Sequence, residues 1–137
     1  MRKLYILFLA LSFLSFIPKT ETNQFVGRWT GEDNGDIGYM VFDAEGYASF
    51  EIKGQVFGGK EFTLQGKKGS MMYEINNTTK PIEVDFIVTQ LETGEQKRML
   101  CIAKFTDANN MRFAMGFNNT RPTAFTELNA IRLKREK

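Results

Sequence analysis

The chain has 137 residues, with 18 basic and 16 acidic side chains, one cysteine and no histidine. This length suits a single domain with one hydrophobic core. The absence of histidine removes the most common general base and zinc ligand, and with them any Ser-His or Cys-His nucleophilic pair.

The first 22 residues are typical of a secretory signal peptide. Two basic residues precede an apolar run from Leu4 to Ile17, which Pro18 ends. The run is shorter than the roughly 18–20 residues that a membrane-spanning helix needs, and it fits the apolar region of a signal peptide. We therefore expect an exported protein, periplasmic or extracellular, that is not an integral membrane protein after leader removal. An uncleaved N-terminal anchor is the alternative.

Removal of the leader changes the charge balance. Cleavage after Thr22 takes away three basic residues and one acidic residue, which leaves 15 of each in the domain at 23–137. Nucleic-acid binding needs a basic stripe along the surface, and the sequence shows only the basic ending "IRLKREK", which is typical of a frayed tail. We predict no nucleic-acid partner.

Short segments with alternating apolar and polar residues follow the leader. A period of two indicates strands with one face toward a core. Gly, Asn and Asp turns separate the segments, as in "DAEG" at 43–46 and "ETGE" at 92–95. The clearest strands are predicted in "YASFEIK", "SMMYEIN", "IEVDFIVT" and "MRFAMGF", with "FVGRWTG" before them and "TELNAIRLK" after them.

These segments indicate an all-β domain of eight or nine strands in sequential hairpins. Regularly spaced short strands favour a meander that closes on itself, with a sandwich as the alternative. Closure leaves no exposed strand edge that could aggregate. We predict an antiparallel, eight-stranded, up-and-down barrel.

The motif Gly27-Arg28-Trp29 resembles the Gly-x-Trp motif that opens the barrel in the lipocalin superfamily. The stretch "KPIEVDF…GEQKRMLCIAKF…NNTRPTAF" resembles uncharacterised exported lipocalin-like domains of bacteria. The resemblance implies that Gly27 and Trp29 belong to a closed barrel end and that an arginine stacks on Trp29, with Arg132 as the first candidate and Arg121 as the second. The resemblance implies a fold but not a function, because the family has no established activity.

The apolar interior is the one feature that points to a function. The inside of an eight-stranded barrel is either filled by side chains or large enough for one small ligand. We predict binding of a small hydrophobic or lipid-like molecule, without a cofactor, by the side chains of Phe42, Phe50, Tyr73, Phe86, Met111, Phe113, Met115 and Phe117. The same residues could instead fill the barrel as a solid core.

The rival hypothesis is a protein-interaction or inhibitor module that binds another exported protein. It rests on apolar residues at positions where water is expected, and contiguous apolar area marks interfaces. The residues concerned are Ile87, Leu100, Ile102, Ile131 and Leu133.

Catalysis and metal binding have little support. Glu83 and Asp85 lie on the predicted outer face of one strand, where carboxylates are normally solvated, so we predict no enzyme. The acidic stretch "GEDNGDIG" lacks the closing Glu of a calcium loop and fits a hairpin turn at Asn34-Gly35, so no metal site is expected. The lone Cys101 lies in an apolar run and is predicted to be a buried, unreactive thiol.

Overall fold

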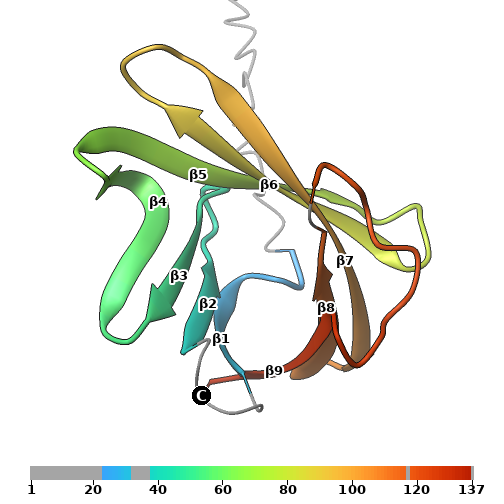
Figure 1. The fold of residues 1–137 in the computed structure, drawn as a ribbon. Coiled ribbons are helices and arrows are strands. Elements are labelled where there is room, and N and C mark those ends of the chain that lie inside the picture. Colours follow the sequence, from blue (N-terminus) through green and yellow to red (C-terminus); the bar gives the residue numbers. More distant parts are fainter. Residues whose placement is uncertain (1–22, 32–37, 117, 137) are drawn as a thin grey trace, which may run out of the picture.

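The computed structural model describes residues 23–31, 38–116 and 118–136. These residues form a closed barrel of nine antiparallel strands (Figure 1). The strands are β1 (Gly27–Gly31), β2 (Tyr39–Phe42), β3 (Ala48–Ile52), β4 (Gln55–Leu64), β5 (Lys67–Asn76), β6 (Ile82–Gln90), β7 (Gln96–Asp107), β8 (Asn110–Met115) and β9 (Ala130–Arg135). The expected leader, the Asn34-Gly35 turn and Phe117 lie outside the described residues.

The topology is the predicted meander. Each strand pairs with the next one along the chain, and β1 pairs with β9 to close the ring. The prediction of an all-β, up-and-down barrel is confirmed, whereas the prediction of eight strands is wrong. The sequence segments allowed eight or nine strands, and the structure forms nine. Strands β3 and β4 are joined by a hairpin turn at Lys53 and Gly54, whose φ angles of 51° and 78° are both positive, as a type I′ turn requires. This turn makes β3 and β4 separate strands.

Strand β4 curls strongly, as its green ribbon shows in Figure 1. Its pairing with β5 shifts register between Gly59 and Phe62. At Gly58, with a φ of 112°, a Cβ atom would lie only 2.5 Å from the carbonyl oxygen of Ala48. Glycine is therefore required where β4 bends against β3, and the bulge lets the sheet turn toward closure.

The barrel interior is packed with aromatic rings. The ring of Phe86 lies 5.8 Å from that of Phe42, 5.1 Å from that of Phe50 and 5.8 Å from that of Phe113, measured between centroids. Tyr73 meets Phe42 edge-on at 4.9 Å. Pairs at these distances contribute about 0.5–1.5 kcal/mol each beyond the burial of their area. The rings thus fill the middle of the barrel.

One end of the barrel is closed around Trp29, which is fully buried. Its indole Nε1 donates a 2.9 Å hydrogen bond to the carbonyl oxygen of Phe25, in the segment before β1. The Phe25 ring packs edge-on against Phe105 at 4.9 Å. The guanidinium carbon of Arg135 lies 4.3 Å from the centre of the Trp29 ring, and Arg135 also donates to the carbonyl oxygen of Gln24.

The arginine on Trp29 is therefore Arg135, and the expectation of Arg132 or Arg121 is corrected. Side chains alternate along β9, so Leu133 points into the core while Arg132 is exposed on the outer face. Arg121 lies in the segment after β8, outside the barrel, where it pairs with Glu83. On β9, only the last residue, Arg135, both faces the barrel interior and lies level with Trp29 along the barrel axis.

The segment after β8 folds back over the outside of the barrel (Figure 1). A Cβ atom on Gly116 would lie within about 2.1 Å of the Leu100 carbonyl oxygen and 2.3 Å of the Thr120 carbonyl oxygen. Ile102 and Ala114, an outward-facing pair on β7 and β8, are 2% and 0% exposed. The segment thus gives the barrel a small second apolar layer. The described residues contain no helix long and apolar enough to span a bilayer.

Candidate functional site

Seven of the eight side chains predicted to bind a ligand lie among the described residues, and these seven are gathered inside the barrel. Four of them are almost completely buried, Tyr73 is 8% exposed, and Phe50 and Met115 are partly buried against the same cluster. The four are Phe42, Phe86, Met111 and Phe113. Because their rings pack on one another, space for a ligand has to be sought at the barrel's surface or its open end.

A small hollow of about 330 Å³ lies at the mouth of the barrel. Its lining residues come from the tip of the β4–β5 hairpin and the tip of the β6–β7 hairpin. Phe62, Leu64 and Val88 line it together with Lys67 and Lys97.

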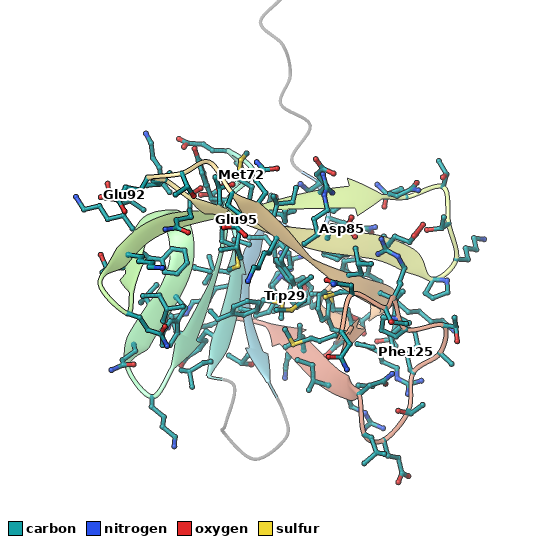
Figure 2. All side chains as sticks on the ribbon, turned by 45° about the horizontal axis from the view of Figure 1, so that its top comes forward. Trp29, Met72, Asp85, Glu92, Glu95 and Phe125 are labelled. Atoms are coloured by element: carbon teal, nitrogen blue, oxygen red, sulfur yellow. The ribbon has the colours of Figure 1, made fainter. Side chains whose placement is uncertain are left out.

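A larger groove of about 740 Å³ lies on the side of the barrel. We call it the basic groove. Its apolar lining includes Pro81, Ile82, Ala103, Phe105 and Phe125, and its charged lining consists of Lys80, Lys104 and Arg112. Figure 2 shows Phe125 on the outside of the barrel, well away from Trp29 in its interior.

The basic groove exists because two neighbouring strands differ in length. The register of β6 with β7 ends at the pair Ile82–Ala103, yet β7 continues to Asp107. Beyond Ala103 the β6 side of β7 is therefore unpaired, and side chains from both faces of β7 reach the groove there. Phe105 comes from the inner face and Lys104 from the outer face.

The cations of this region are aligned across the sheet. Lys104 on β7 is directly opposite Arg112 on β8, and Arg112 is directly opposite Arg132 on β9. Opposite residues in antiparallel strands have Cβ atoms about 4.5–5.5 Å apart, so like charges at these positions repel each other. None of the ion pairs formed among the described residues includes Lys80, Lys104, Arg112 or Arg132.

The carboxylates that sequence analysis singled out are engaged in ion pairs. Arg121 Nε lies 2.9 Å from Glu83 Oε2, and Arg121 Nη2 lies 2.7 Å from Asp85 Oδ1. Arg98 Nη1 lies 3.2 Å from Asp85 Oδ2 and 3.0 Å from Glu74 Oε2. In Figure 2, Asp85 lies on the outside of the sheet. Among the described residues, no cluster of three or more Asp, Glu, Cys or His side chains could hold a metal ion.

Cys101 is fully buried, as predicted. Burial raises the pKa of its thiol to about 12, with the nearby Asp85 charge adding to the effect, although the backbone at Gly116 opposes it. A thiol with such a pKa is protonated at neutral pH and is a poor nucleophile.

The apolar residues behind the interaction hypothesis are not a surface patch. Ile131 and Leu133 pack against the barrel core, and Ile102 is buried on the outer face under the segment that follows β8. Ile87 is 8% exposed. Leu100 is partly exposed. Among the residues that the structure describes, the exposed large apolar side chains are instead Val56, Leu64, Met72, Leu91 and Leu128.

No protein-family model, curated protein or solved structure matches the chain. The closed antiparallel barrel is compatible with the lipocalin-like fold that the Gly-x-Trp motif implied.

Proposed function

We propose that this protein is an exported, non-catalytic, lipocalin-like barrel that binds a small hydrophobic or lipid-like ligand. The ligand lies in the basic groove and not in the barrel interior. The observation that carries the proposal is the groove's combination of about 740 Å³ with an apolar lining. Ligand pockets typically have about 300–1,000 Å³ and mostly apolar walls with a few polar groups.

The interior is a weaker candidate than the groove. Small barrels are either filled by side chains or hold a ligand, and the rings of Phe42, Phe50, Phe86 and Phe113 pack together here. A ligand inside would have to displace this cluster, whereas the groove is open to solvent as it stands.

Two experiments test the proposal on the mature protein. Organic extraction followed by mass spectrometry should recover a co-purified apolar molecule. Titration with Nile red, an uncharged dye whose fluorescence rises in apolar surroundings, should show saturable binding to one site.

Variants locate the site. Phe125→Ala removes one wall of the groove and should weaken dye binding, whereas Leu128→Ala, on the same segment but fully exposed, should leave it unchanged. If Leu64→Ala weakens binding instead, the site is the barrel mouth. Absence of both dye binding and a co-purified molecule would refute the proposal.

A protein-interaction or inhibitor module is the second candidate function. The packed aromatic interior favours it, because a barrel with a solid core presents only its surface to a partner. Cross-linking in the exported fraction, followed by mass spectrometry, should then identify one protein partner. A protein that stays monomeric and uncross-linked would count against this function.

A further inference from the structure

We infer that the ligand of the basic groove is an anionic amphiphile, whose carboxylate or phosphate head is held by Lys104 and Arg112. This inference rests on the proposed function and names the chemistry of its ligand. Three observations carry it: the register of the cations, the lack of acidic partners for them among the described residues, and the apolar wall beside them.

The register places like charges next to each other at a cost to stability. Lys104, Arg112 and Arg132 occupy directly opposite positions on three adjacent strands and share the outer face of the sheet. Such a row is destabilising unless an anion lies over it. A bound anionic group would be attracted by all three charges at once.

Other arginines on the outer face are neutralised by carboxylates. Arg28 pairs with Glu51 at 2.6 Å, and Arg98 and Arg121 both pair with Asp85. Within residues 23–31, 38–116 and 118–136, no such partner is found for Arg112 or Arg132. On the outer face of the described sheet, the arginines without a carboxylate partner are therefore Arg112 and Arg132, which lie at or next to the groove.

The Phe125 ring positions the Arg112 guanidinium so that its N–H groups can bind an anion. Its carbon lies 5.0 Å from the centre of the Phe125 ring. This contact with the ring leaves the N–H groups at the guanidinium's edge available, and these donors match a carboxylate or a phosphate in two-point hydrogen bonding. Lys104 lies directly across from Arg112, and Lys80 lines the same groove.

The apolar wall explains why the anion should carry a hydrocarbon chain. Pro81, Ile82 and Phe105 line the same groove as Lys104 and Arg112. A chain along this wall would be removed from water while its head stays at the cations. An inorganic anion would use the cations and leave the apolar wall uncovered.

The test compares three competitors that share a hydrocarbon chain and differ in the head, together with inorganic phosphate, which has no chain. Bound Nile red is displaced with decanoate, decyl phosphate, decanol and inorganic phosphate, at equal and low ionic strength. Decanoate or decyl phosphate should displace the dye at about tenfold lower concentration than decanol, a factor that corresponds to one charge-assisted interaction. The better of the two acids identifies the head group.

Variants assign the preference to residues. Arg112→Gln and Lys104→Gln should each remove most of the acid-over-alcohol preference, measured in each variant as the ratio of the decanol and decanoate concentrations that displace half of the dye. Lys134→Gln is the matched control, because Lys134 is exposed on β9 outside the groove and should keep the preference. Circular dichroism checks that each variant is folded, and either groove variant alone suffices for the test.

The possible failures are distinct. Equal displacement by decanoate and decanol would overturn the anion inference and leave small-ligand binding intact. Displacement by inorganic phosphate as strong as by decyl phosphate would overturn the requirement for a chain. Failure of the dye to bind at all would overturn the proposed function itself.

Discussion

Arg121 joins the segment after β8 to the middle of β7. Its Nη1 donates a 2.9 Å hydrogen bond to the carbonyl oxygen of Cys101, while its Nε and Nη2 lie within 2.9 Å of Glu83 and Asp85. The same segment carries Phe125, a wall of the basic groove. The shape of the groove therefore depends on one side chain outside it.

Replacement of Arg121 should affect both stability and ligand binding. Arg121→Gln removes a partly buried charge with three partners, so we expect the free energy of unfolding to fall by about 1–3 kcal/mol in urea denaturation. Nile red affinity should fall as well, because the segment is released. Arg98→Gln, which breaks more exposed ion pairs, should lower the free energy of unfolding by less than Arg121→Gln does, because solvent screens exposed pairs. Equal costs for the two variants would contradict this assignment.

Arg135, and not Arg132, should govern the environment of the single tryptophan. Arg135→Leu removes the contact with the Trp29 ring and the bonds to the carbonyl oxygens of Gln24 and Val26. We expect a loss of about 1–3 kcal/mol and stronger quenching of Trp29 fluorescence by acrylamide. Arg132→Leu, on the outer face, should leave quenching unchanged. If quenching changes in Arg132→Leu and not in Arg135→Leu, the assignment of Arg135 as the arginine on Trp29 is refuted.

Cys101 should be unreactive until the barrel unfolds. With its pKa raised to about 12 by burial, the thiol should not react with Ellman's reagent at pH 8 in the native protein and should react once per chain in denaturant. The unfolded thiol ionises from its ordinary pKa of 9.0 upward. Stability should therefore decline between that pH and about 12, and Cys101→Val should lose this part of the decline.

Asp107 should contribute to stability at neutral pH but not in acid. Its carboxylate accepts hydrogen bonds from the Asn109 backbone N–H and the Asn110 side-chain amide in the β7–β8 turn, and these lower its pKa below 3.8. A lowered pKa gives stability above the ordinary value that is lost as the pH falls through the folded-state value. Thermal melts of Asp107→Asn should thus show a shallower acid limb than wild type. Glu45→Gln, in the β2–β3 turn, is the control.

Alternation along single strands was enough to predict the barrel and its core. In "YASFEIK" the predicted inward residues Ala48 and Phe50 do pack in the interior, and in "MRFAMGF" Met111 and Phe113 do as well. These predictions succeeded because a strand's side-chain direction is a local property with a period of two.

The basic groove could not be predicted in the same way. The row of Lys104, Arg112 and Arg132 exists only once three strands are in register, and residues so far apart in the sequence carry no local sign of it. The basic ending "IRLKREK" was the one available signal. Its charges are typical of a frayed tail, although the overlapping segment "TELNAIRLK" was predicted to be a strand and Ala130–Arg135 is one. The expectation of Arg132 or Arg121 on Trp29 failed for a related reason, since the last inward position depends on where β9 ends.

The ring of strands has a seam. Every hairpin joins strands that are neighbours in the chain, but β1 and β9 meet from opposite ends of it and pair only over Trp29–Gly31, whereas β5 and β6 pair from Gly69 to Asn76. Closing so long a loop costs the most entropy for the fewest ladder bonds. Local opening of the barrel should therefore begin between β1 and β9. In hydrogen exchange, deuterium should replace the amide protons of this seam well before those between β5 and β6.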